Sequence, residues 1–147
     1  MEEIQFRHRL PVQIRFSDVD QYGHMNNSVY FSLYDLAKTA YLRDVFGTLV
    51  WDQLGIVVAN VNADFLAPVF FTDRLEIETA VTHLGNKSFT LFQRAVDLAS
   101  GIVKCQCRTV MVAYDTVAKM PVEVPASFKE TVCAFEGKSL EALSGSH

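Results

Sequence analysis

Apolar residues recur at helical spacing across residues 28–46, a segment that contains neither proline nor glycine. They form one broad stripe, as a helix with 3.6 residues per turn requires: Tyr30, Leu33, Tyr34, Ala37, Ala40, Tyr41 and Val45. Gly47 follows directly and is typical of a helix end. Because Phe31 and Leu42 interrupt the polar side, we expect this helix to be buried over most of its girth and wrapped by a sheet.

Alternating or continuous apolar positions predict strands along most of the remaining chain. The predicted strands cover residues 10–17, 56–65, 74–84, 87–98 and 103 to about 114. Turn signals at Gly85-Asn86 and Ser100-Gly101 separate the last three strands. A short amphipathic helix is predicted over residues 126–135.

The predicted order is one strand, a long helix, and then four strands joined mainly by hairpins. Tight turns require antiparallel neighbours, so the simplest architecture is of the α+β class. In this architecture one curved antiparallel sheet surrounds the central helix. The chain shows no internal repeat and no linker, and its length suits one core, so we expect a single domain over residues 1–147.

The composition narrows the classes of partner. Half of the 147 residues are hydrophobic and the formal net charge is −4, which argues against nucleic acid as the main partner. No polybasic segment indicates a membrane surface, and the charged opening MEEIQFRHRLP predicts neither a signal peptide nor a membrane span. Three cysteines cannot all pair with one another and nothing indicates secretion, so the cytoplasm is the expected location.

The most unusual stretch is DVDQYGHMNN, residues 18–27, which leads directly into the predicted helix. Its opening resembles a calcium-binding EF-hand loop, but the fifth and twelfth positions hold Tyr22 and Val29 instead of oxygen ligands. A transition-metal site built from Asp18, Asp20 and His24 lacks an obvious fourth ligand. We therefore expect no metal here.

Cys105 and Cys107 alternate along a predicted strand, so their side chains face the same way. Only Cys133 remains to join them in a metal site. Unpaired cysteines usually serve as small buried hydrophobic residues, and we expect that role for this pair.

Two interpretations of residues 18–27 remain open. In the structural one, Asn26, Asn27 or Ser28 caps the helix, while the preceding polar side chains satisfy N–H groups of the loop. In the functional one, the helix N-terminus offers unpaired N–H groups to an oxygen that becomes negative during a reaction. Asp20, seven residues before Asn27, would then act as a base or nucleophile in an attack on a carbonyl.

The segment RFSDVDQYGHMNNSVYFSLYDLAKTAYL resembles the signature of the 4-hydroxybenzoyl-CoA thioesterase family, a branch of the hotdog-fold acyl-CoA thioesterases. The family pattern, approximately D-x-D-x-x-G-H-x-N-N-x-x-Y, is met at Asp18, Asp20, Gly23, His24, Asn26, Asn27 and Tyr30. The resemblance covers about residues 8 to 130 and implies a five-stranded antiparallel sheet wrapped around a long central helix. It also implies hydrolysis of an acyl-CoA thioester to free acid and CoA.

The resemblance assigns the catalytic carboxylate to Asp20 and the N–H that polarises the thioester carbonyl to Asn27. It places Lys87 and Ser88 near the CoA phosphates. The remaining motif residues would orient water, substrate or the catalytic carboxylate: His24, Asn26 and Tyr30. Another hotdog branch carries its carboxylate on the central helix; Asp35 is the candidate here, ranked below Asp20 because it lies away from the apolar stripe.

The residues around the motif glycine depart from those of the 4-hydroxybenzoyl enzyme, so its own substrate is not implied. The resemblance also implies a homodimer or a dimer of dimers, with active sites completed across the interface. We expect an acyl-CoA substrate, with acyl carrier protein as an alternative carrier, and no cofactor. The alternatives are a hotdog hydratase acting on enoyl thioesters and a non-catalytic module that binds acyl thioesters.

Overall fold

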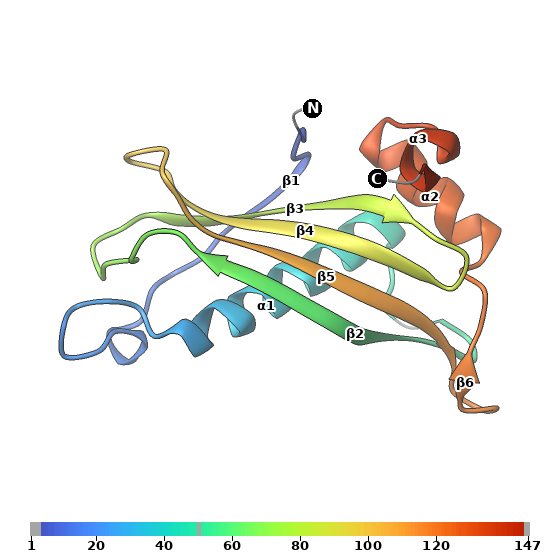
Figure 1. Cartoon of the computed structure of the whole chain (residues 1–147), viewed down its shortest axis with the longest axis horizontal. Helices are drawn as coiled ribbons and strands as arrows, with labels where there is room; N and C mark the ends of the chain where they lie inside the picture. Colours follow the sequence, from blue (N-terminus) through green and yellow to red (C-terminus); the bar gives the residue numbers. More distant parts are fainter. Residues whose placement is uncertain (1–3, 50, 146–147) are drawn as a thin grey trace.

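The computed structural model describes residues 4–49 and 51–145. The structure orders its elements as strand β1, a 3-10 turn, helix α1, five further strands and two short helices (Figure 1). Their bounds are β1 His8–Pro11, η1 Phe16–Asp18, α1 Asn27–Phe46, β2 Leu54–Phe65, β3 Leu75–Leu84, β4 Ser88–Asp97, β5 Val103–Asp115, β6 Met120–Pro121, α2 Ala126–Glu136 and α3 Leu140–Ser144.

The strands form one antiparallel sheet in the order β1-β3-β4-β5-β2, with the two-residue β6 paired to β5. The described sheet therefore has six strands, one more than predicted, because two residues are too few to give a pattern. The β3–β4 turn closes where the Gly85 N–H donates to the Ser88 carbonyl at 2.7 Å. At the β4–β5 turn, Gly101 adopts a φ of 75°, which favours glycine.

The first strand differs from its prediction. It covers His8–Pro11 rather than residues 10–17, and the chain leaves the sheet soon after Pro11. Asp18 accepts a hydrogen bond from the Arg15 N–H at 2.8 Å and so draws residues 15–18 into a turn. The alternation of apolar and polar residues does not show that a nearby side chain will hydrogen-bond to the backbone in place of a neighbouring strand.

Helix α1 runs along one face of the sheet (Figure 1) and ends at Gly47, whose N–H donates to the Arg43 carbonyl at 2.8 Å. Its buried side contributes to two clusters of the core. At its N-terminal half Tyr30, Tyr34 and Ala37 pack with β3, β4 and β5. At its C-terminal half Tyr41 and Leu42 pack with the sheet and with α2 and α3.

The prediction that α1 is buried over most of its girth is wrong for the single chain. Its other side is open, and Phe31 and Leu36 are exposed. The reason is geometric, because the sheet lies against one side of the helix and ends at the edge strand β2. None of the described helices is long and apolar enough to cross a membrane.

A buried carboxylate is hydrogen-bonded inside this core. Glu136 of α2 accepts hydrogen bonds from the Tyr41 hydroxyl at 2.5 Å and the Val81 N–H at 2.9 Å. Burial raises the pKa of this carboxyl above its ordinary value of 4.5. Cys105 and Cys107 are buried thiols, as predicted, and burial raises the pKa of Cys105 to about 11.

We predict that Glu136→Gln removes a pH-dependent part of the stability. The pKa of Glu136 is raised on folding. The stability that its protonated carboxyl contributes is therefore fully present below the pKa of the unfolded chain and is lost as pH rises through the pKa of the folded chain. The free energy of unfolding of the wild type, measured by urea denaturation from pH 4.5 upward, should therefore fall relative to that of the variant. The control variant Glu130→Gln changes an exposed residue of the same helix. The difference between its free energy of unfolding and that of the wild type should stay constant over this pH range.

Candidate active site

The loop before α1 is anchored by Asp18, which is only 3% exposed. Its carboxylate accepts hydrogen bonds from the Arg15 N–H at 2.8 Å and from the Arg15 guanidinium at 2.9 Å. These bonds hold the pKa of Asp18 below its ordinary value of 3.8. The Asp18 carbonyl in turn accepts from the Asn26 N–H at 2.8 Å, so this residue connects both ends of the loop. Its contacts are those of a structural residue.

Asp20 closes the tip of the same loop and is exposed. One carboxylate oxygen, Oδ1, accepts hydrogen bonds from the Tyr22 N–H at 2.9 Å and the His24 N–H at 3.2 Å. The Gly23 N–H donates to the Asp20 carbonyl at 3.0 Å, and Gly23 has a φ of 78° that suits glycine. Within the described residues Oδ2 has no partner, which leaves it available to an external group.

Asn26 is the N-cap of α1. Its side-chain oxygen accepts from the Ser28 N–H and from the Ser28 hydroxyl, both at 3.0 Å, and its carbonyl accepts from the Val29 N–H. Among the described residues the N–H of Asn27 meets no acceptor. The tip of the helix therefore keeps an open donor together with the positive end of the helix dipole.

A cleft of about 190 Å³ lies beside this tip. His24, Met25, Asn27 and Tyr30 line one side, and residues 65–68, at the end of β2, line the other. The Met25 N–H donates to the Val69 carbonyl at 2.7 Å and fixes the loop against this second segment.

The cleft walls are largely apolar. The ring of His24 stands edge-on to Phe70, with ring centroids 5.3 Å apart. Tyr30 is buried, and burial raises the pKa of its hydroxyl, so it stays protonated. Asn26 and Asp20 stand outside the lining: Asn26 caps the helix, and Asp20 reaches the wall through its bond to the His24 N–H.

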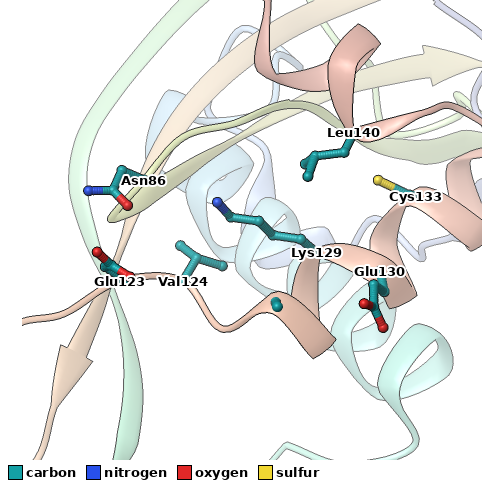
Figure 2. A pocket seen from close by; sticks show the side chains of 8 residues that line it. Asn86, Glu123, Val124, Lys129, Glu130, Cys133 and Leu140 are labelled. Carbon is teal, nitrogen blue, oxygen red and sulfur yellow. The ribbon is translucent and has the colours of Figure 1, made fainter.

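Lys87 and Ser88 lie elsewhere. They follow the β3–β4 turn, at the opposite end of the long axis of the molecule from the tip of α1 (Figure 1). Asn86, directly before them, lines a separate cavity of about 310 Å³ formed with α2 and α3. Figure 2 shows the Lys129 side chain extending toward the gap between Asn86 and Leu140. One chain therefore does not bring Lys87 and Ser88 to the cleft.

Asp35 also remains apart from the cleft. Its carboxylate accepts from the Lys38 ammonium at 3.0 Å and its side chain is 72% exposed on the open side of α1. Residues 66–68 of the lining were missed by sequence reasoning, in which the predicted strand ended at Phe65. The break at Pro68 was the available signal. Within the described ranges no three His, Cys, Asp or Glu side chains gather to hold a metal ion.

Comparison with known proteins places this geometry in a family. A model described as the thioesterase-like superfamily matches residues 14–132. The chain belongs to this superfamily. One relative is the acyl-CoA thioesterase YbgC of Haemophilus influenzae. It is 30% identical over 130 residues, which cover 85% of this chain and 91% of the relative. An Escherichia coli acyl-CoA thioester hydrolase YbgC is 26% identical, covering 81% and 90%.

Solved structures have the same fold. A thioesterase of Thermus thermophilus, complexed with coenzyme A and Zn, superposes with a TM-score of 0.77 at 26% identity, covering 91% of this chain and 98% of that one. The Pseudomonas aeruginosa protein PA5185 gives 0.78 at 28% identity, covering 89% and 92%. The antiparallel sheet with its helices fits the hotdog fold, and the resemblance drawn from the motif is confirmed at superfamily level.

We predict that Asp18→Asn weakens the fold of this superfamily member by about 1 kcal/mol at pH 7, because a charge-assisted bond to the largely exposed Arg15 is lost. The folded pKa of Asp18 is depressed, so its stabilisation is present above the unfolded pKa and is lost as pH falls through the folded value. Urea unfolding from pH 7 down to pH 2.5 should show the two proteins converging at the acid end. Asp52→Asn, at an exposed turn, is the matched control.

Proposed function

We propose that this protein is a thioester hydrolase that cleaves an acyl-CoA thioester to free acid and CoA. The observation that carries the proposal is the open Asn27 N–H at the tip of α1, on the wall of a cleft beside which Asp20 is held. The YbgC relatives named as acyl-CoA thioesterases, and the coenzyme A complex of the Thermus protein, support this substrate class.

The Asn27 N–H donates to the thioester carbonyl oxygen. As the tetrahedral intermediate forms, negative charge develops on that oxygen, and the donor and the helix dipole stabilise it. A donor placed in this way contributes about 3–4 kcal/mol to lowering the barrier. Asn26 keeps this geometry fixed, because its side chain occupies the Ser28 N–H and leaves the Asn27 N–H for the substrate.

Asp20 supplies the attacking chemistry by one of two routes. As a general base, its Oδ2 takes a proton from a water that attacks the carbonyl carbon, and the C–S bond then breaks to release the CoA thiolate. As a nucleophile, Oδ2 forms a mixed anhydride, releases the thiolate and is regenerated by water. Both routes use the oxygen that the loop leaves open, while Oδ1 stays anchored by the Tyr22 and His24 N–H groups. His24 and Tyr30 position the reactants.

The assembly proposed for the active form contains at least two copies of the domain spanning residues 1–147. Strand β2 is one edge of the sheet, and its exposed residues include Val57, Val58 and Val61. A long apolar edge strand is a template for pairing with a second chain. Because Lys87 and Ser88 lie far from the tip of α1 in their own chain, they reach CoA phosphates at a tip only across such an interface.

Asp20→Asn should leave the fold intact and lower kcat by at least 100-fold, because the amide neither takes a proton nor attacks carbon. The measurement is release of free thiol from a panel of acyl-CoA esters, with circular dichroism to verify folding. Asp35→Asn removes an exposed carboxylate of α1 and should keep wild-type turnover.

Near-normal turnover by Asp20→Asn, or its loss in Asp35→Asn, would reject the assignment. Hydration of an enoyl-CoA without release of thiol would indicate a hydratase instead. Binding of CoA esters that stay intact would indicate a non-catalytic module.

The oligomeric state provides a separate prediction. In sedimentation equilibrium the wild type should have two or four times the mass of one chain. Val58→Lys places a charge on the apolar edge of β2 and should shift the equilibrium toward the single chain and lower the activity. Val117→Lys, at an exposed turn outside the strands, should change neither quantity. A monomeric wild type with full activity would contradict the proposed assembly.

A further inference from the structure

Lys104 is a charged residue inside the sheet. It belongs to β5, yet it is only 6% exposed. Along β4, Ala95 pairs with Cys105 of β5. The next residue, Val96, pairs with Val103, so Lys104 is the extra residue of a bulge. Bulges re-aim a side chain and are frequent beside active sites. Burying an ammonium group is costly unless the group is paired and hydrogen-bonded, so the partners of Lys104 indicate what its burial serves.

Both the side chain and the carbonyl of Lys104 bind the segment that follows β2 and carries one wall of the cleft. The ammonium group donates to the Pro68 carbonyl at 3.0 Å and forms an ion pair with the Asp73 carboxylate at 3.2 Å. The Lys104 carbonyl accepts from the Leu66 and Ala67 N–H groups at 2.9 and 3.0 Å. One residue of β5 thus holds both ends of this segment.

The ion pair also fixes Phe70. The Asp73 oxygen of the pair, Oδ2, accepts from the Phe70 N–H at 2.9 Å, and the Phe70 carbonyl accepts from the Asp73 N–H at 3.0 Å. The Lys104 ammonium lies 5.4 Å from the centre of the Phe70 ring, within the range of a cation–π contact. The two charged side chains are only 7% and 14% exposed, so salt screens their attraction little.

Phe70 and Val69 connect this segment to the loop in front of α1. The Val69 carbonyl accepts from the Met25 N–H at 2.7 Å, and the Phe70 ring stands edge-on to the ring of His24. The His24 N–H donates to Oδ1 of Asp20 at 3.2 Å, and the His24 carbonyl accepts from the Asp20 N–H at 2.9 Å. The buried ion pair is therefore linked to the proposed catalytic carboxylate by contacts within one chain, which do not depend on a second chain at the β2 edge.

We propose that Lys104 is a positioning residue for the hydrolysis: its buried ion pair with Asp73 fixes the cleft wall and, through it, Asp20. The proposal rests on the thioesterase function argued above and gives a role to a residue outside the cleft lining. A misplacement of about 1 Å caused far from the chemistry costs about 100-fold in rate. Loss of the ammonium should lower kcat at least tenfold. KM should change less than threefold, because the CoA phosphates are proposed to bind at Lys87 and Ser88 instead.

The test compares Lys104→Met with the double variant Lys104→Met/Asp73→Asn. Methionine keeps the apolar stem but leaves the Asp73 charge without its partner, which destabilises the fold. The added Asp73→Asn change removes that charge and keeps an oxygen for the Phe70 N–H, so the free energy of unfolding, measured in urea, should recover. In thiol-release assays kcat should stay low in both variants, because neither restores the ammonium that binds the Pro68 carbonyl.

A control variant and a local readout separate positioning from stability. Arg94→Met removes a partner, 2.8 Å away, of Glu78, another buried carboxylate of the same sheet, and Arg94 lies outside the cleft lining. This variant should lose stability and keep the wild-type kcat. Hydrogen exchange of the Met25 amide, which donates to Val69, should be at least tenfold faster in both Lys104 variants than in the wild type. Arg94→Met should leave that exchange rate unchanged.

The outcomes distinguish the inference from the function on which it rests. Release of thiol from none of the acyl-CoA esters by the wild type would overturn the proposed function, and the role of Lys104 with it. In an active wild type, near-normal kcat in folded Lys104→Met would overturn the inference alone. So would recovery of kcat together with stability in the double variant, or a loss seen only in KM. Low kcat at near-normal KM in a stable double variant, with fast exchange at Met25, would support it.

Discussion

The site depends on how the backbone N–H groups in front of α1 are satisfied. The first turn of any helix lacks internal acceptors for its N–H groups. Here the loop provides partners for the neighbours: Asn26 takes the N–H of Ser28 and Val29, while the Asp18 carbonyl takes that of Asn26. Asn27 lines the cleft, and among the described residues its N–H meets no acceptor. One donor is thereby left free beside the cleft, and the proposed stabilisation of an oxyanion requires such a donor.

The two aspartates of the motif lie in different environments. Asp18 is buried against Arg15, and its carboxylate is used on both oxygens. Asp20, two residues later, is exposed and keeps one oxygen open. The same chemical group thus anchors the loop at one position and is available for reaction at the other. The motif therefore serves as a helix cap and as candidate chemistry at once, and the two interpretations of its sequence do not exclude each other.

The arrangement of the sheet explains why one chain looks incomplete. The sheet covers one side of α1 and ends at β2, so apolar side chains of both elements stay exposed. Lys87 and Ser88, at the β3–β4 turn, lie at the far end of the molecule from the helix tip. Self-association at the β2 edge would cover the exposed apolar side chains. It would also give Lys87 and Ser88 of one chain a role at the helix tip of another.

The sequence by itself determined the long elements and the motif. Their periodicity extends over ten or more residues, so α1, α2 and β2–β5 lie within about two residues of the expected ranges. It also narrowed the N-cap to Asn26, Asn27 or Ser28, of which the structure has Asn26, and determined the buried cysteine pair, because caps and alternation are local properties. The early end of β1 and the role of Asp18 were missed although they are local, because the hydrogen bond between Asp18 and Arg15 leaves no trace in the hydrophobic pattern. Tertiary structure decided the rest. The walls at residues 65–68 and the distance of Lys87 from the site depend on contacts between segments far apart in the chain, and local patterns carry no record of such contacts.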